Sequence, residues 1–338
     1  MKNVTIKDVA RISNVSRTTV SRVINKSSLV KESTMKAVYE AMEKSGYVYN
    51  AVAGNLSRRK TSIIGLIIPT IKNSIFSLST LGIQEYAHER GYTVLLGNSN
   101  YSKQDENHLL FLFMERRVDG LILTGRGQDP SLIKNLQKKT IPFVITWQTF
   151  QSDEDLNFVG FDNFAAAYKM VEYLIGLQHR RIGLIVGRFS KTERALERWK
   201  GYEDCLSNHG IEYDPQLIIE KDYSFIEGKE GMQRLLSLHP PPTAVFCASD
   251  ILAVGAMSSI REKGLSIPGD ISIGGFDDNE YASFCVPALT TIRVPTYEMG
   301  KLAAQVLIDI VEGQRTYTSH YCLETDLIIR GSCKALDS

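Results

Sequence analysis

Two groups of residues in this chain have the types and spacing needed for recognition chemistry, and the first group lies near the N-terminus. Arginine can donate two parallel hydrogen bonds to guanine, and serine or threonine hydroxyls can bond to base edges. The candidates for reading bases are Arg17, Thr18, Ser21 and Arg22. Thr5, Ser16 and Asn25 carry hydroxyl or amide groups suited to phosphate oxygens. The pattern predicts a DNA-reading helix that begins near Ser16.

The second group lies where predicted strands end, and it suits a polyhydroxylated ligand. Carboxylates accept pairs of hydroxyl hydrogens, the arginine fork donates to oxygens, and aromatic faces cover apolar patches of a ring. The candidates are Trp147, Asp162, Arg198, Tyr223, Asp250 and Asp277. Each aspartate also stands where a helix N-cap is expected, so capping alone could explain all three. The two aromatic residues could equally be core residues.

A cluster of cations suggests a more specific hypothesis about the ligand. The segment 187–199 contains Arg188, Lys191, Arg194 and Arg198. If this segment faces the cleft, its charge favours an anionic ligand such as a phosphosugar or a sugar acid. One alternative is a solvated loop in which Glu193 and Glu197 balance half of the charge. Another is a surface ion pair between Arg198 and Glu197.

Short helices within residues 1–46 are expected to position the first group. Thr5 caps the first helix, Asn14 makes a turn, Ser16 caps a second helix that runs to about Asn25, and a third helix runs from about Glu32 to Ser45 before Gly46 ends it. Two short helices joined by a tight turn are typical of helix-turn-helix proteins, whose second helix enters the major groove. A small helical bundle with a solvated polar face is the alternative.

Charge divides the chain into a basic start and an acidic remainder. Residues 1–60 contain 12 Lys and Arg against 4 Asp and Glu, a net charge of +8. The remaining residues contain 27 against 34, a net charge of −7. A basic segment on an acidic body indicates a polyanionic partner for that segment alone.

Beyond the basic segment, predicted strands alternate with predicted helices. The strands are Ile63–Ile68, Thr93–Gly97, Gly120–Thr124, Pro142–Thr146, Phe158–Gly160, Ile182–Val186, Leu217–Ile219, Ala244–Cys247 and Ile271–Gly274, and the helices include Leu81–Arg90, Ala165–Leu177, Arg198–His209 and Ile251–Lys263. Such alternation predicts an α/β fold in which helices cover parallel sheets. The number of strands suits two Rossmann-like lobes with a cleft between them, and ligands bind such sheets beyond the carboxyl ends of the strands.

Several other classes of protein find no support in the sequence. The five cysteines form no CxxC pair and the six histidines lack metal-ligand spacing, so we expect neither a metal site nor a cofactor. Neither a GxxxxGK[ST] phosphate loop nor a GxSxG elbow occurs, and nothing favours an enzyme. The N-terminus lacks the apolar stretch of a signal peptide, and no apolar run is long enough to span a bilayer. We therefore expect a cytoplasmic protein without membrane contact.

The runs Val4–Ala10 and Val15–Asn25 resemble the headpiece of the LacI/GalR repressor family. The resemblance extends to about Arg330 through Gly91-Tyr92, Arg117–Ile122, Pro242–Phe246, Ile267-Pro268 and Pro287–Ile292. It implies a ligand-gated repressor that binds double-stranded operator DNA as a homodimer. The small-molecule effector, a sugar or phosphosugar, would bind between two lobes of the periplasmic-binding-protein type I. A binding protein of a transport system and a sugar-modifying enzyme are the competing interpretations.

The resemblance also implies domain boundaries and site residues. The expected parts are a headpiece (1–46), a hinge helix (47–61), a sensor (62–330) with one lobe at about 62–161 and 293–320 and the other at about 162–290, and a C-terminal tail (331–338). In the hinge, Asn50 would contact phosphate and Leu56 would wedge into the minor groove. The ligand residues of the family carry over to Arg198 and Asp277, to Tyr223 as an aromatic platform, and to Ile75 and Phe76.

Overall fold

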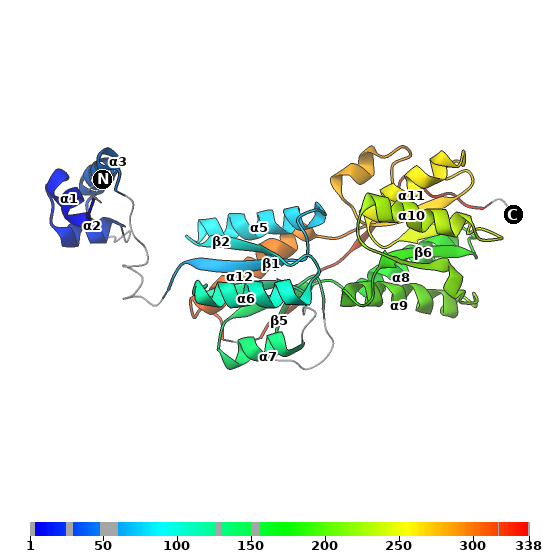
Figure 1. Ribbon diagram of the computed structural model, residues 1–338, viewed down its shortest axis with the longest axis horizontal. Helices are drawn as coiled ribbons and strands as arrows, with labels where there is room; N and C mark the ends of the chain where they lie inside the picture. The colour runs from blue at the N-terminus through cyan, green and yellow to red at the C-terminus, as the bar shows by residue number, and fades with distance from the viewer. Residues whose placement is uncertain are drawn as a thin grey trace. The chain divides into compact units, whose positions relative to one another are not determined.

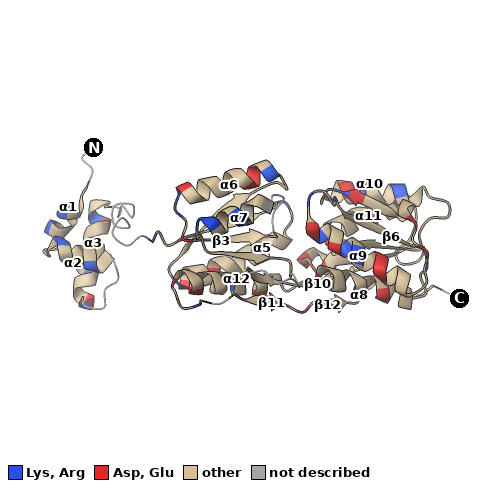
Figure 2. Cartoon of the chain, turned by 90° about the horizontal axis from the view of Figure 1, so that it is seen from below, with Lys and Arg blue, Asp and Glu red and all other residues tan. Residues whose placement is uncertain are grey.

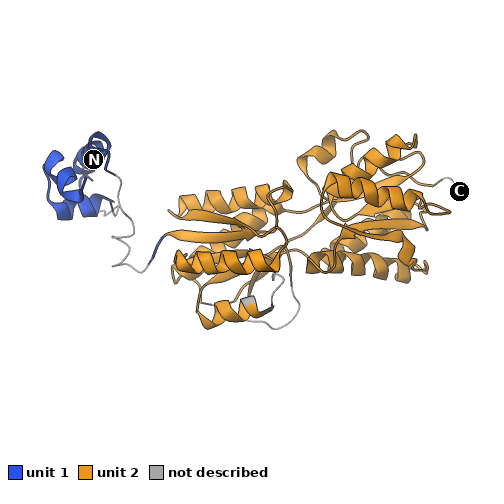
Figure 3. Ribbon diagram, viewed as in Figure 1, with its two compact units in different colours: residues 1–61 blue, residues 62–338 orange. Residues whose placement is uncertain are grey.

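The structure is a computed structural model that describes residues 4–24, 30–47, 60–125, 130–149, 156–316 and 318–336. The chain divides into two compact units, Met1–Thr61 and Ser62–Ser338 (Figure 3). We call the first the headpiece unit and the second the sensor unit. Each unit encloses its own hydrophobic core.

Short amphipathic helices form the headpiece unit: α1 (Ile6–Ile12), α2 (Arg17–Ile24) and α3 (Glu32–Ser45). Their buried side chains are Val9, Ala10, Val20, Val23, Val38 and Ala41. The apolar spacing of α2 places Val20 and Val23 on one face, so the residues between them point outward. This core fixes the orientation of α2 against α1 and α3.

The predicted caps and turn of the headpiece are confirmed. The backbone N–H of Thr5 donates to the Asp8 carboxylate at 3.0 Å, and the backbone N–H of Thr19 donates to Ser16 Oγ at 3.0 Å. Asn14 turns the chain at φ 51°, and Gly46 ends α3 at φ 65°. Both residue types tolerate this left-handed region.

The described part of the sensor unit holds two sheets of six strands, one in each lobe (Figure 1). The first sheet has the order β11-β5-β4-β3-β1-β2, and its neighbouring strands are parallel. Its strands are β1 (Ile63–Ile68), β2 (Thr93–Asn98), β3 (Gly120–Thr124), β4 (Phe143–Thr146), β5 (Asn157–Gly160) and β11 (His320–Cys322). The helices of this lobe are α5 (Ile75–Glu89), α6 (Lys103–Glu115), α7 (Pro130–Lys138) and α12 (Thr296–Val311).

Helices bury both faces of this first sheet, which explains why its strands are almost continuously apolar. Ile64 and Leu66 belong to the core cluster that includes residues of α5 and α12. Ile67 belongs to a separate cluster with residues of α6 and α7. Helices α5 and α12 approach closely because glycines stand at their contact: a Cβ at Gly82 would lie 2.3 Å from the backbone oxygen of Tyr297.

The second sheet has the order β12-β10-β9-β8-β6-β7, and only β12 runs antiparallel to its neighbour among the described strands. Its strands are β6 (Ile182–Gly187), β7 (Ile218–Lys221), β8 (Ala244–Cys247), β9 (Ser272–Asp277), β10 (Thr290–Arg293) and β12 (Asp326–Ile328). The helices of this lobe are α8 (Asn163–Gly176), α9 (Glu193–Asn208), α10 (Phe225–Leu236) and α11 (Asp250–Glu262). The α/β fold with two lobes that the sequence predicted is confirmed.

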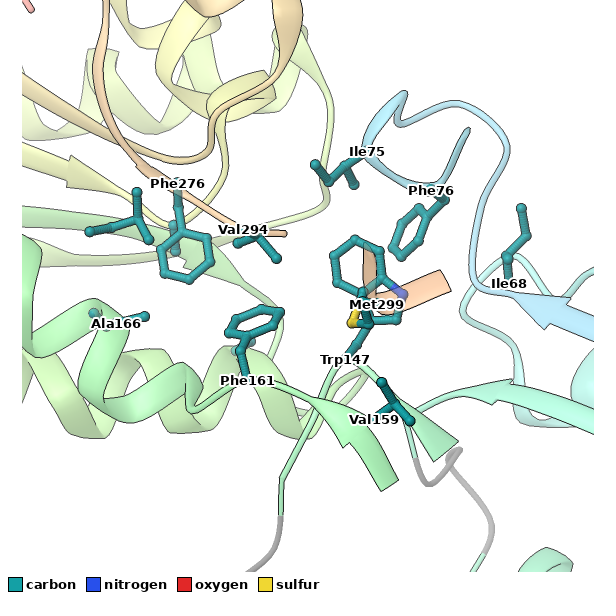
Figure 4. Packing of buried hydrophobic residues seen from close by; sticks show 14 of the residues in the cluster. Ile68, Ile75, Phe76, Trp147, Val159, Phe161, Ala166, Phe276, Val294 and Met299 are labelled. Atoms are coloured by element: carbon teal, nitrogen blue, oxygen red, sulfur yellow. The ribbon is translucent and has the colours of Figure 1, made fainter. Parts of the chain in front are cut away.

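The chain passes between the lobes after β5, after β10 and after β11. One apolar cluster continues across this junction, from Val159 and Trp147 in the first lobe to Phe161 and Phe276 in the second (Figure 4). Residues 331–336 pack on the second lobe beyond Arg330, because Ser332 Oγ donates to the backbone oxygen of Ile273 at 2.6 Å. None of the described helices combines the length and apolar character that a bilayer crossing requires.

Several predicted element boundaries were wrong. Helix α9 begins at Glu193, not at Arg198, so the segment expected to be a loop contains its first turn. Thr192 stands at the N-cap, and threonine is a usual helix-start residue, so the sequence carried a signal for this start that the prediction did not use. Strands β10, β11 and β12, of four, three and three residues, were not predicted.

Candidate DNA-reading helix and interlobe cavity

Helix α2 presents the predicted base-reading residues on the side opposite the headpiece core. Arg17, Thr18 and Arg22 are exposed, and Ser21 is half-buried. Among described residues, the headpiece helices carry more Lys and Arg than Asp and Glu (Figure 2). An exposed row of this composition is able to donate hydrogen bonds to bases and phosphates.

The residues predicted to contact DNA phosphates differ in the hydrogen bonds that their side chains already make. Ser16 begins α2, where its Oγ also lies 2.8 Å from Thr19 Oγ1. The hydroxyl of Thr5 donates to the Asp8 carboxylate at 2.7 Å, so its proton is already engaged. Three further predicted contacts, Asn25, Asn50 and Leu56, lie outside the described residues.

A cavity lies between the lobes of the sensor unit. It is lined by Asn73, Ile75, Phe76, Tyr101, Trp147, Arg194, Arg198, Tyr223, Ser249 and Asp277. The structure therefore brings together seven of the predicted ligand residues: Ile75, Phe76, Trp147, Arg194, Arg198, Tyr223 and Asp277. We call this space the main chamber.

Sequence reasoning missed Asn73 and Tyr101 and did not propose Ser249 as a ligand residue, although all three line the main chamber. Asn73 immediately precedes α5, and Tyr101 lies between β2 and α6. Both follow carboxyl ends of strands in the first sheet, which is the signal that could have identified them.

Neutral partners hold the side chain of Arg198, which lines the main chamber. Its Nε donates to Asn163 Oδ1 at 2.9 Å, and its Nη1 donates to the backbone oxygen of Ala248 at 2.6 Å. The guanidinium carbon lies 3.7 Å from the centroid of the Phe276 ring, a cation–π arrangement. These contacts orient the fork and leave its second terminal nitrogen for another acceptor.

Asp277 ends β9 in the wall of the chamber. Its Oδ2 accepts a hydrogen bond from Ser249 Oγ at 2.7 Å. Burial raises the pKa of Asp277 to about 6, and nearby Arg198 opposes that shift. Its backbone has φ 116° and that of Trp147 has φ 72°. Conformations of this kind are costly for residues other than glycine and are concentrated at functional sites.

Aromatic rings form another wall of the main chamber. The rings of Phe76 and Trp147 lie side by side with centroids 4.8 Å apart (Figure 4). Tyr101 and Tyr223 face each other from different lobes at 6.0 Å. Flat apolar surfaces beside charged groups are typical of sites that bind sugar rings.

Two predicted ligand residues do not line the chamber. Asp162 Oδ1 caps α8 by accepting from the backbone N–H of Ala165 at 2.9 Å. The fully buried Asp250 accepts from Thr291 Oγ1 at 2.6 Å and from the backbone N–H of Asn279 at 2.7 Å. Burial and neighbouring Asp277 raise the pKa of Asp250. We therefore assign both carboxylates a role in holding the fold and exclude them from the residues proposed to contact the ligand.

A second space, the side chamber, adjoins the first through Tyr101 and Arg194, which line both. Its other polar side chains include Ser99, Ser102 and Gln148 and the charged residues Glu106, Lys191 and Glu193. Among the described residues, no group of three His, Cys, Asp or Glu side chains is arranged to hold a metal ion.

Comparison with known proteins places both units in one family. Residues 5–50 match the family described as bacterial regulatory proteins, lacI family, and residues 171–333 match a periplasmic binding protein-like domain. The HTH-type transcriptional repressor CytR of Escherichia coli (strain K12) is 37% identical over 332 residues, which cover 98% of this chain and 97% of CytR.

Solved structures agree with this assignment. The Lac repressor dimer bound to operator and the anti-inducer ONPF matches with a TM-score of 0.86 at 29% identity, covering 99% of this chain and 100% of that one. The complex of the transcriptional regulator CelR with cellobiose matches with a TM-score of 0.73 at 31% identity, covering 97% and 99%. With a headpiece that matches the lacI family, two sensor lobes and relatives matched along nearly its whole length, this chain belongs to the LacI family of bacterial transcriptional regulators.

Proposed function

We propose that this protein is a cytoplasmic repressor that binds a near-palindromic operator as a homodimer and responds to a sugar or sugar derivative in the main chamber. The observation that carries the proposal is that one chain combines an exposed arginine-bearing helix with a cavity lined by Arg198, Asp277 and aromatic rings. The first feature suits DNA and the second suits a polyhydroxylated ligand. The Lac repressor and CelR complexes support each half of this proposal by likeness.

Exposed apolar side chains on the sensor unit support the homodimer. Leu78 and Leu81 on α5, and Leu95 and Leu96 on the edge strand β2, are exposed although they are large and apolar. Elements α5 and β2 contact each other, so these residues belong to adjacent elements of the first lobe. A second copy of the chain is the partner that would cover this surface and align two headpieces with a two-fold operator.

A short segment beside the chamber offers a route from ligand binding to lobe movement. Asp277 lines the chamber, and the next two residues, Asp278 and Asn279, make contacts outside it. Asp278 pairs with Arg293 at 2.8 Å, just before the chain crosses back into the first lobe. Asn279 Oδ1 accepts from Ser74 Oγ of the first lobe at 2.8 Å. A ligand that moves Asp277 would therefore act on the crossover that follows β10 and on the contact between Ser74 and Asn279 that joins the lobes.

We predict that Asp278→Asn separates effector binding from its consequence. Asparagine keeps the shape and tolerates φ 55°, but it loses the charge that holds Arg293 and Arg330. Effector affinity should change less than about threefold, whereas the effect of the ligand on operator affinity should fall by about 1 kcal/mol or more. Calorimetry and fluorescence anisotropy measure the two quantities.

Asp214→Asn is the control for that experiment, because Asp214 also pairs with an arginine of the second lobe, Arg181, at 2.9 Å. This variant should keep both affinity and response. Equal losses of response in the two variants would contradict the route through Asp278.

The proposed function as a whole is tested by binding the purified chain to the DNA upstream of its own reading frame and to a scrambled fragment. We expect at least a thousandfold preference for the native fragment, two chains per site, and affinity that falls steeply with salt. An effector found by thermal shift should change operator affinity about 5- to 150-fold. Equal binding to both fragments at moderate ionic strength would refute the proposal.

A further inference from the structure

Among the described residues, no carboxylate forms an ion pair with the buried Arg194 side chain. Its side chain comes from the first turn of α9 and lines both chambers, yet the residue is only 8% exposed. Its Nη1 donates a 3.3 Å hydrogen bond to the backbone oxygen of Thr124. Burial lowers the pKa of Arg194, and neighbouring Arg198 acts in the same direction. A buried charge in this condition is expensive to maintain unless a ligand compensates for it.

The other charged groups of this segment are already occupied. Arg188 and Lys191 both pair with Asp222, at 3.2 Å and 2.8 Å, so neither depends on the cleft for a partner. Glu193 accepts from the side-chain nitrogen of Gln148 at 3.1 Å. Sequence alone allowed a solvated loop in which glutamates balance the arginines, but among described residues no ion pair joins Arg194 to either glutamate.

The carboxylate of Glu197 is a weak counter-charge for Arg194. Burial, followed by the nearby Glu193 carboxylate, raises the pKa of Glu197 to about 7. The charged form of Glu197 is therefore disfavoured relative to that of a solvated glutamate. Glu197 is consequently a weaker counter-charge for Arg194 than an ordinary glutamate would be.

The lining of the main chamber carries two arginines against one aspartate. That aspartate, Asp277, already accepts a hydrogen bond from Ser249. Among the described lining residues, the main chamber thus has an excess of one positive charge, and the guanidinium of Arg194 has further donors beyond the one that bonds to Thr124. Aromatic rings stand beside them, so a ring and an anionic substituent would both find matching surfaces.

We propose that the effector is a sugar derivative with one anionic group, a carboxylate or a phosphate, and that Arg194 binds this group. The inference rests on the proposed function, because it names the chemical class of the ligand for the same cavity. Hydroxyl groups of the ligand would face Asp277 in the main chamber and the Ser99 and Ser102 side of the side chamber.

The first experiment uses inorganic phosphate as the probe, because it needs no knowledge of the sugar. Phosphate is titrated calorimetrically into the full chain and into Arg194→Met, Arg194→Lys and Arg188→Met. Arg188→Met makes the same change of charge on a side chain that is 43% exposed and paired with Asp222. We expect binding to weaken at least tenfold in Arg194→Met, to weaken less in Arg194→Lys, and to stay unchanged in Arg188→Met. Absent phosphate binding, or equal binding to all four proteins, would overturn the proposal.

The second experiment compares neutral sugars with their uronic acids and 6-phosphates, using thermal shift and operator release. The acids and phosphates should bind at least tenfold tighter than their neutral parents, and Arg194→Met should abolish the difference. A preference for uronic acids assigns the anionic group to a carboxylate, and a preference for 6-phosphates assigns it to a phosphate. A neutral sugar that releases the operator equally well from wild type and Arg194→Met would overturn this inference and leave the proposed function standing. Failure to bind the native operator specifically would count against the proposed function instead.

Discussion

Replacing Asp277 with asparagine is expected to weaken effector binding about 10- to 150-fold, which corresponds to the 1.5–3 kcal/mol typical of a hydrogen bond to a charged group. Asparagine has nearly the same volume, and its oxygen can still accept the hydrogen bond from Ser249. It removes the charge that pairs ligand hydroxyls and that faces Arg198 in the chamber. The affinity is measured by calorimetry with the effector identified in the screen.

Operator binding without effector should be unchanged in this variant, because Asp277 lies in the sensor unit and not in the headpiece unit. Stability should change little, since burial already raises the pKa of the Asp277 carboxyl to about 6 and so disfavours its charged form. Asp204→Asn is the matched control: Asp204 is exposed on α9 and contacts Asn208. If both variants lost effector affinity equally, or neither did, Asp277 would not be a ligand residue.

The sequence predicted the architecture well because its signals are local. Buried parallel strands such as Ile63–Ile68 are continuous apolar runs, and that strand has the bounds that were predicted. Glycine at position 46 and asparagine at position 14 marked the two left-handed positions found among the described residues of the headpiece. The C-terminal strands were missed because their register depends on pairing with distant strands, as when β12 pairs antiparallel with β10.

The lining of the main chamber was harder to predict. Residues that occupy similar positions relative to the end of a strand lie at different depths in the cleft. Asp162 and Asp277 both follow or end a strand, yet Asp162 caps a helix and Asp277 lines the cavity. Sequence also could not decide whether Arg194 was solvated. The answer depends on the start of α9 and on the packing of Thr124 from the other lobe. The depth of a side chain in the cleft depends on tertiary packing, which the neighbouring residue types in a single sequence do not specify.

Arg22→Met in α2 is expected to reduce operator affinity about 5- to 150-fold, the 1–3 kcal/mol that one bidentate arginine–guanine contact contributes to discrimination. Arg22 is exposed, while its neighbour Val23 is fully buried in the headpiece core. The substitution should therefore leave the fold of the headpiece intact, which circular dichroism can verify. Binding to scrambled DNA should change much less, because a non-specific complex depends on the total charge and not on the identity of one side chain.

Arg11→Met separates these two contributions, since it removes the same charge from the neighbouring helix α1. Arg11 is exposed and lies 3.8 Å from Asp8, a distance at which a surface pair contributes little stability. It should lower affinity for native and scrambled fragments by similar small factors, whereas Arg22→Met should reduce the ratio between them. If Arg22→Met left that ratio unchanged in anisotropy titrations at several salt concentrations, α2 would bind phosphates without reading bases. The predicted specificity would then have to come from another element.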